Sequence, residues 1–162
     1  MTNELEILVV DDKSENRAGA KAYFDTRQDV RVDYATNYED AERKIQEKPY
    51  AFGLFDVQMP RTDGKETEEL GYKLAELAEK NTIDWATVTS GTTHGNIPGT
   101  FVKYCFTGLD TRGEGIGYEK TNQNLWKAVY EKLLGEHPSI RMLVRAKQRY
   151  FQVVGKNPIK LE

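Results

Sequence analysis

Four short segments, three of them mainly apolar, divide the first 90 residues of the chain. The first is residues 5–10 (LEILVV), a continuous run that ends directly at Asp11 and Asp12. The others are residues 30–35 (VRVDYA), 50–55 (YAFGLF) and 84–90 (DWATVTS). Runs of this length and composition predict strands, and the most continuous of them predict strands covered on both faces of a sheet.

The segments between these runs have helical spacing. Ser14 opens a helical stretch whose apolar positions include Ala18, Ala22 and Tyr23, and residues 37–48 form a charged amphipathic helix. Two further helices are expected over residues 65–80, with Leu70, Leu74, Leu77 and Ala78 on one face, and over residues 122–134. Strands that alternate with helices predict an α/β fold, in which a parallel sheet has helices on both faces.

Residues 91–117 break this alternation. They hold seven of the 13 glycines, and no part of them has convincing helical spacing. Only residues 100–106 (TFVKYCF) have the pattern of a strand, and order returns with residues 116–120 (IGYEK), which would bring Lys120 to a strand end. We therefore expect an irregular glycine-rich insertion here. A basic helical segment, residues 139–154, follows near the end of the sequence.

Composition places limits on the function. A chain of 162 residues forms one domain with a sizeable core, and a formal net charge of −3 argues against a general nucleic-acid binder. The lone Cys105 fits a reducing compartment. No leader and no long apolar span is evident, so we expect a cytoplasmic protein without a membrane anchor. Residues 161–162 (LE) resemble a vector remnant.

Polar side chains stand where the predicted strands end. They are Asp11, Asp12, Asp56, Thr89 and Lys120. In an open parallel sheet, ligands bind at this carboxyl edge. Three carboxylates in one cleft repel each other and are tolerated mainly with a bound cation, and an all-oxygen ligand set suits Mg²⁺. With Mg²⁺ present, a carboxylate can attack a phosphoryl group while a lysine and a hydroxyl contact its oxygens.

Each of these residues also has a simpler interpretation. Asp11 and Asp12 could begin a turn and cap the next helix, and Asp56 alone is more often a turn residue than a phosphate acceptor. A hydroxyl such as Thr89 is common at a strand end. Together these interpretations are weaker, because three independent strand ends would have to agree by chance.

Four segments, taken together, resemble one known family. They are VVDD (residues 9–12), FDVQMPRTDG (55–64), VTS (88–90) and a later lysine, Lys120. In this combination the chain resembles the receiver domain of two-component response regulators, and the similarity extends over residues 4–90 and, less closely, 116–135. The Asp pair and the Asp-x-x-Met-Pro stretch with Gly64 are the most specific part.

The resemblance implies a fold and a division of the chain. The fold would be a flavodoxin-like, doubly wound, five-stranded parallel sheet of strand order 2-1-3-4-5. Residues 1–135 would form the receiver-like domain, with 91–117 as its atypical region. Residues 136–160 would be a basic helical extension at the C-terminus.

The resemblance also implies roles for individual residues. Asp56 would accept the phosphoryl group, and Asp12 would be the main Mg²⁺ ligand, with Asp11 beside it. The backbone carbonyl of Gln58 would be a further ligand. Thr89 and Lys120 would contact the phosphoryl oxygens, and Thr89 would change position on phosphorylation.

Two features depart from the family pattern. The family places a proline in a cis peptide bond after the lysine, whereas Thr121 follows Lys120 here. A cis bond before a non-proline residue costs roughly 2.5–4 kcal/mol, so either the site tolerates that strain or the bond is trans. Lys103 is a rival lysine, but it follows Thr89 too closely for a crossover helix before a parallel strand. Tyr118 also fits the position of the family's aromatic switch residue poorly.

The sequence thus predicts a signalling protein rather than an enzyme. It would accept phosphate from a sensor histidine kinase, a phosphotransfer protein or a small phosphodonor, and would then bind a downstream protein. A homodimer is one assembly left open. The alternatives are a degenerate receiver that binds partners regardless of phosphate and a Mg²⁺-dependent phosphohydrolase. The second lacks a carboxylate two residues after Asp56 to act as general acid or base.

Overall fold

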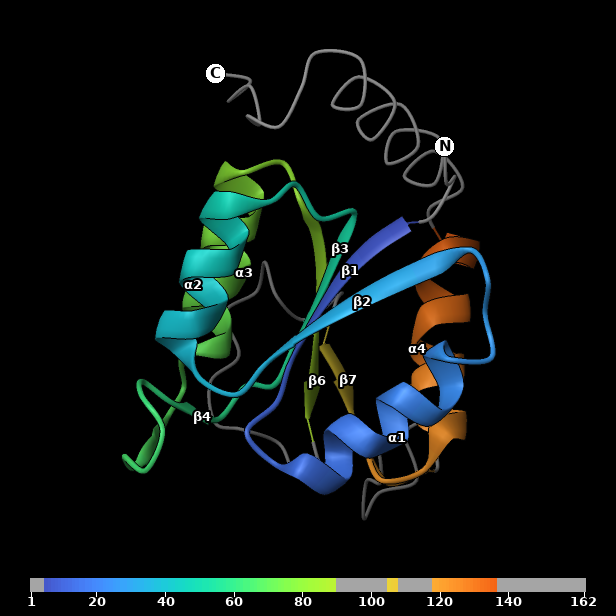
Figure 1. The fold of residues 1–162 in the computed structure, drawn as a ribbon, viewed down its shortest axis with the longest axis horizontal. Coiled ribbons are helices and arrows are strands. Elements are labelled where there is room, and N and C mark those ends of the chain that lie inside the picture. Colours follow the sequence, from blue (N-terminus) through green and yellow to red (C-terminus); the bar gives the residue numbers. More distant parts are fainter. Residues whose placement is uncertain (1–4, 90–104, 108–117, 137–162) are drawn as a thin grey trace.

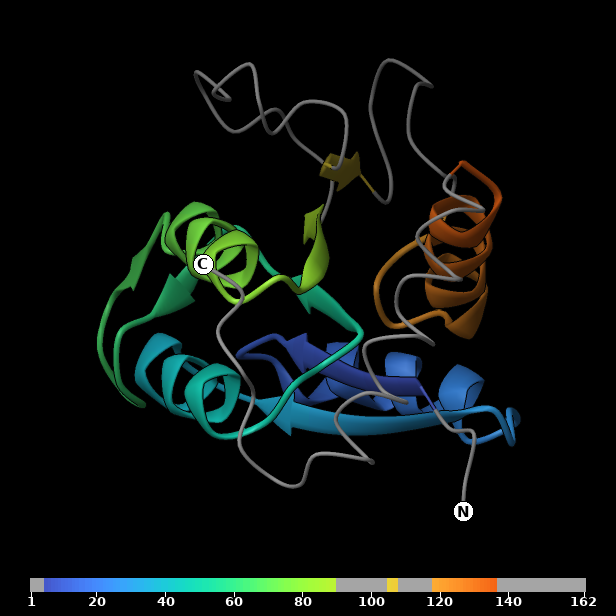
Figure 2. The same cartoon turned by 90° about the horizontal axis from the view of Figure 1, so that it is seen from above.

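The computed structural model describes residues 5–89, 105–107 and 118–136, which form a parallel sheet between two layers of helices (Figures 1 and 2). The sheet has five strands in the order β2-β1-β3-β6-β7. They are β1 (Leu5–Val10), β2 (Val30–Ala35), β3 (Phe52–Phe55), β6 (Asp84–Thr89) and β7 (Cys105–Thr107). Counted along the chain, these strands have the predicted order 2-1-3-4-5, and the flavodoxin-like α/β fold is confirmed.

Helices cover both faces of the sheet. On one face lie α1 (Ser14–Phe24) and α4 (Gln123–Glu136), and on the other lie α2 (Tyr38–Glu47) and α3 (Gly71–Lys80) (Figure 1). The side chain of Asn37 caps α2 by accepting a hydrogen bond of 2.8 Å from the backbone N–H of Asp40. The predicted helices at residues 37–48 and 122–134 agree with α2 and α4 to within two residues.

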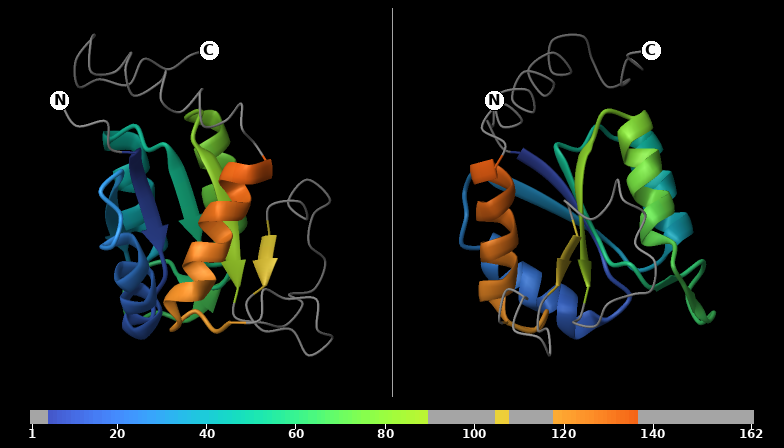
Figure 3. Two further views of the ribbon diagram at one scale, coloured as in Figure 1. Left: turned by 90° about the vertical axis from the view of Figure 1, so that its right-hand side faces the viewer. Right: turned by 180° about the vertical axis from the view of Figure 1, so that it is seen from behind.

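The central position of β1 explains why its sequence is apolar at every position except Glu6. Leu5, Ile7 and Val9 pack into the core beneath α1 and α4, whereas Leu8 and Val10 pack into the core beneath α2 and α3. Both faces of the strand are therefore buried, as in other parallel sheets. All five strands run in the same direction, so their carboxyl ends share one edge of the molecule (Figure 3).

Helix α1 buries a different set of residues from the one predicted. Tyr23 is buried as expected, but Ala18 and Ala22 are exposed, so that part of the prediction is wrong. The buried residues are Asn16, Gly19, Ala20, Tyr23 and Phe24. Because a polar residue and a glycine occupy the inner face, the apolar pattern alone places that face incorrectly.

The helix predicted over residues 65–80 begins later, at Gly71. The residues before it fold back as a small hairpin, in which β4 (Met59–Pro60) pairs antiparallel with β5 (Thr67–Glu68). At the base of this hairpin a Cβ on Gly71 would lie 2.2 Å from the backbone oxygen of Asp56. The chain can return this close to Asp56 only because residue 71 is glycine.

The last strand also lies elsewhere than predicted. Residues 118–120 form a bend and a turn rather than the end of a strand at 116–120, and β7 takes the edge position instead. β7 runs parallel to β6 with only residues 90–104 between them. A parallel strand does follow β6 at this short distance, so the reason given for excluding a strand near Lys103 is wrong.

Several predictions concern residues outside the described ranges. These are the irregular region apart from β7, the rival Lys103 and, beyond its first residue, the basic extension at 136–160. Among the residues that are described, no helix combines the length and the apolar character needed to cross a bilayer.

Candidate functional site

Three of the predicted carboxylates meet at the carboxyl edge of the sheet. Asp11 and Asp12 follow β1 and Asp56 follows β3, whose last residues pair in register as Val10 and Phe55. The backbone N–H of Asp56 donates to the Val10 carbonyl at 2.8 Å, which continues the ladder to the site. One carboxylate oxygen of each aspartate lies within 4.8 Å of the other two.

Asp11 is the most enclosed of the three, with 1% of its surface exposed. Its Oδ1 accepts a hydrogen bond of 3.0 Å from the backbone N–H of Lys13, and the amide of Asn16 contacts its two oxygens at 3.2 and 3.3 Å. The guanidinium of Arg17 donates to its backbone carbonyl at 2.8 Å. Asn16 was not predicted, because the apolar pattern of α1 does not place this polar residue on the inner face.

The side chain of Lys120 lies between two of these aspartates. It is 2% exposed, and Nζ lies 2.9 Å from Asp11 Oδ2 and 2.9 Å from Asp56 Oδ1. The described residues contain no cis peptide bond, so the bond to Thr121 is trans. Lys120 thus reaches both carboxylates from a turn that precedes α4, without the backbone geometry that the family pattern implies.

The charges in this cluster do not balance. Burial raises the pKa of Asp56 to about 6; Lys120 opposes that rise and Asp11 adds to it. The pKa of Asp12 is also raised, first by burial and then by its neighbour Asp11. Burial alone would lower the pKa of Lys120, but Asp56 and Asp11 outweigh it and hold the pKa above its usual value. Three carboxylates around one ammonium leave an excess of negative charge that favours a cation.

Thr89 and Gln58 complete the predicted set. Thr89 is the last residue of β6, is 2% exposed, and pairs in register with Thr107 of β7. Gln58 lies in the segment that leads from Asp56 into the hairpin and is partly buried. Tyr118 is 40% exposed, so it does not pack into the core beside Lys120.

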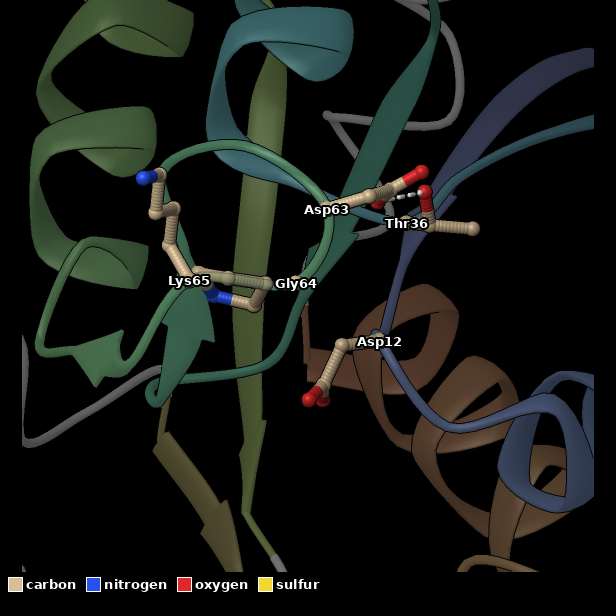
Figure 4. A pocket seen from close by; sticks show the side chains of 6 residues that line it. Asp12, Thr36, Asp63, Gly64 and Lys65 are labelled. Carbon is tan, nitrogen blue, oxygen red and sulfur yellow. Dashed lines mark hydrogen bonds between the residues drawn. The ribbon is translucent and has the colours of Figure 1, made fainter.

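A hollow of about 440 Å³ opens on the Asp12 side of the site (Figure 4). Its walls are Asp12, Thr36, Pro60, Asp63, Gly64 and Lys65. Asp63 fixes one wall, because it accepts hydrogen bonds from the Thr36 hydroxyl at 2.8 Å and from the Asn37 amide at 2.9 Å. These bonds tie the hairpin loop to the loop after β2, so the opening beside Asp12 has defined walls.

Comparison with known proteins identifies the family and the fold. A family model described as the response regulator receiver domain matches residues 7–91, a little more than half of the chain. The transcriptional regulatory protein ResD of Bacillus subtilis (strain 168) is 42% identical over 65 residues, which cover 40% of this chain and 27% of the relative. The match therefore spans about a quarter of the length of that relative.

Solved structures with a similar fold include receiver domains from two other organisms. A response regulator receiver domain protein (CheY-like) of Methanospirillum hungatei JF-1 superposes with a TM-score of 0.56 at 18% identity, over 84% of this chain and 98% of that one. The response regulator domain of Thermotoga maritima CheB gives 0.52 at 22% identity, over 87% and 96%. These likenesses concern the fold alone. With the family match over residues 7–91, they lead to the conclusion that this chain belongs to the response regulator receiver domain family of two-component signalling.

Proposed function

We propose that the chain accepts a phosphoryl group on Asp56 in the presence of Mg²⁺ and thereby changes a surface that binds a protein partner. One observation carries this proposal: Lys120 Nζ lies 2.9 Å from Asp56 while Asp11 and Asp12 lie beside the same carboxylate. The side chain of Asp56 is 11% exposed, against 1% for Asp11, so Asp56 is the more accessible of the two carboxylates that contact Lys120.

The chemistry requires the ionised form of Asp56. With a pKa of about 6, this carboxylate is largely ionised above pH 7. One of its oxygens attacks the phosphorus of acetyl phosphate, an oxygen–phosphorus bond forms, and the bond from phosphorus to the acetate oxygen breaks. Acetate leaves with the bonding electron pair. The ammonium of Lys120, already in contact with Asp56, is within reach of the phosphoryl oxygens that this transfer adds.

The residues present fit Mg²⁺. Asp12 and Asp56 are the proposed direct ligands, because both oxygens of Asp11 already accept hydrogen bonds from the protein. The backbone carbonyl of Gln58 is the further proposed ligand, and Asp11 lies beside the ion and adds negative charge without contacting it. When bound, Mg²⁺ would supply positive charge for the phosphoryl oxygens and offset the repulsion between the carboxylates.

Receiver domains are signalling proteins, and we infer two partners for this one. The donor would be a sensor histidine kinase or a phosphotransfer protein of a phosphorelay, and the output a downstream protein, both in the cytoplasm. A phosphoryl group adds charge and acceptor oxygens beside Thr89 and Lys120. A conformation in which both contact the group would then be favoured over the resting one.

The test is the intact mass of the protein after incubation with acetyl phosphate and Mg²⁺. We expect a gain of one phosphoryl group in the wild type and in Asp33→Asn, a matched aspartate variant on another part of the sheet. We expect no gain in Asp56→Asn or in EDTA. If the wild type gains nothing and does not bind beryllofluoride, the proposal is wrong and a phosphate-independent interaction module replaces it.

A further inference from the structure

The position of the Lys120 side chain depends on how its backbone is held. The chain enters the site from the turn before α4, where the N–H of Asn122 donates to the carbonyl of Glu119 at 2.9 Å. From there a flexible four-carbon stem must bring Nζ to two carboxylates at once. A lysine side chain has many rotamers, so the backbone of Lys120 must be held in place if Nζ is to contact both carboxylates in one defined geometry.

The carbonyl of Lys120 has a specific partner. The indole N–H of Trp126, in the first turns of α4, donates to it at 2.7 Å, which is a short hydrogen bond for a nitrogen donor. Trp126 is 1% exposed and Lys120 is 2% exposed, so water does not compete for this bond. A buried carbonyl without a donor would be costly, which makes the bond a strong constraint on the turn.

Helix α1 confines the same carbonyl from another side. A Cβ on Gly19 would lie 2.4 Å from the Lys120 oxygen and 2.8 Å from the carbonyl carbon of Thr121. Only a glycine permits this approach. The buried face of α1 that carries Gly19 also carries Asn16, whose amide contacts Asp11. Helix α1 thus contacts both the backbone of Lys120 and Asp11, one of the two carboxylates that Lys120 binds.

We propose that Trp126 is the positioning residue of Lys120, because its hydrogen bond holds the Lys120 backbone in place. Gly19, which has no side chain, leaves the space that the Lys120 carbonyl occupies. The indole hydrogen bond stands in for the proline that the family pattern places after this lysine, because Thr121 follows here in a trans peptide bond. The role of the positioned lysine rests on the proposed phosphoacceptor function. The positioning itself can be measured without phosphate.

The chain offers a matched pair of variants. Trp126→Phe keeps an aromatic ring in the core but removes the indole N–H, together with some buried volume. Trp85→Phe is the control, since Trp85 is also buried and its indole N–H also donates a hydrogen bond, to Glu79 at 3.2 Å. The Glu79 contact involves none of Asp11, Asp12, Asp56 and Lys120, so a general effect of losing one buried indole bond appears in both variants.

The first readout is the rate at which acetic anhydride modifies Lys120, followed by peptide mass spectrometry, with the exposed Lys65 and Lys73 as internal standards. We expect Trp126→Phe to raise the Lys120 rate about tenfold, which corresponds to one lost hydrogen bond of about 1.4 kcal/mol. Trp85→Phe should leave that rate unchanged. Equal rates in the two variants would overturn the positioning role.

The second readout is the rate of phosphorylation by acetyl phosphate at fixed Mg²⁺. We expect Trp126→Phe to slow it about tenfold relative to Trp85→Phe, with no change in Mg²⁺ affinity. If the wild type gains no phosphate but Trp126→Phe still raises the acetylation rate of Lys120, the proposed function is wrong and the positioning role of Trp126 stands. If the wild type is phosphorylated but the two variants do not differ in either rate, the positioning role is wrong and the proposed function stands.

A second variant keeps the inference testable if Trp126→Phe fails to fold. Gly19→Ala leaves the tryptophan in place but pushes against the same carbonyl from α1. We expect it to raise the acetylation rate of Lys120 while the standards at Lys65 and Lys73 stay constant. If the Gly19→Ala protein folds and the acetylation rate of Lys120 does not rise, the proposed role of Gly19 in placing the Lys120 carbonyl is wrong, and so is the proposed positioning of Lys120.

Discussion

Lys120 and Lys48 each lie between two carboxylates, but in surroundings that differ in burial and in charge. Lys120 Nζ contacts Asp11 and Asp56, both at 2.9 Å, and is almost completely buried. Lys48 Nζ contacts Glu6 at 2.7 Å and Asp33 at 2.9 Å on the α2 face of the sheet, and a third of its side chain is exposed. We call the first group, with Asp12, the acidic site, and the second, with Tyr50, the Lys48 cluster.

The pKa values of the aspartates show what this difference does. In the Lys48 cluster burial opposes ionisation of Asp33, but hydrogen bonds from Tyr50 and Lys48 outweigh it and hold the pKa below its usual value. In the acidic site burial and carboxylate repulsion win over Lys120, and the pKa of Asp56 rises to about 6. In the Lys48 cluster, hydrogen bonds from the protein alone stabilise the ionised form of Asp33. In the acidic site they do not stabilise ionised Asp56 enough, and the excess negative charge is typical of a functional site.

Replacing each lysine by methionine should give the largest contrast. Lys120→Met leaves buried carboxylates without their cation, and we expect the free energy of unfolding to fall by about 3 kcal/mol or more. Lys48→Met removes partly exposed ion pairs and should lower it by about 1 kcal/mol or less. Urea denaturation at pH 7.5 in EDTA measures both. Equal losses would mean that burial does not distinguish the two clusters.

Removing one aspartate charge should change stability in opposite directions. The folded-state pKa of Asp56 is raised from 3.8 to about 6, so its ionised form disfavours the folded state, and this penalty is complete above about pH 6. Asp56→Asn should therefore raise the free energy of unfolding by about 3 kcal/mol at pH 8 in EDTA. At pH 4 the gain should largely vanish, because most of the wild-type Asp56 is then protonated when folded.

Asp33→Asn is the matched counterpart. The folded-state pKa of Asp33 is lowered, so its charge stabilises the folded state above the unfolded pKa, and that contribution disappears as pH falls through the folded value. We expect a loss of less than about 1 kcal/mol at pH 8, since the group is partly exposed. A gain in stability for Asp33→Asn, or a loss for Asp56→Asn, would reverse the assignment of the two clusters.

The sequence was sufficient for one part of this contrast and insufficient for another. Continuous apolar runs located β1, β3 and β6, and hence Asp11, Asp12 and Asp56, because a strand buried on both faces leaves few places for a carboxylate. Hydrophobic spacing failed where a polar or small residue faces inward for a specific contact. Asn16 bonds Asp11, and Gly19 admits the carbonyl of Lys120.

Two other features were out of reach for a related reason. The leucine spacing after Gly64 continues smoothly into α3, so nothing in it reveals that Thr67–Glu68 pairs back onto Met59–Pro60. The hydrogen bond from Trp126 to Lys120 joins a side chain to a backbone carbonyl, which no pattern of residue types encodes. Contacts that depend on the path of the backbone need the folded structure.

Metal addition should separate the two clusters by a smaller amount. If Mg²⁺ binds the acidic site, a concentration ten times the dissociation constant raises the free energy of unfolding by about 1.4 kcal/mol. Asp12→Asn should abolish most of this response, whereas Glu6→Gln in the Lys48 cluster should preserve it. The comparison is urea denaturation with Mg²⁺ and with EDTA. An undiminished response in Asp12→Asn would exclude this residue as the main ligand.

The smallest expected effect tests why the Lys48 cluster is self-sufficient. The hydroxyl of Tyr50 donates to Asp33 Oδ2 at 2.7 Å, the same oxygen that Lys48 contacts. Tyr50→Phe removes this donor, so the pKa of Asp33 should move up toward its usual value while that of Asp56 stays near 6. Stability should fall by less than about 1 kcal/mol at pH 7 and by less still near pH 3. Carboxyl carbon chemical shifts of the two aspartates, followed against pH, measure both groups in one sample. A change in the pKa of Asp56 in this variant would mean that the two clusters are electrostatically coupled and that the Lys48 cluster contributes to the raised pKa of Asp56.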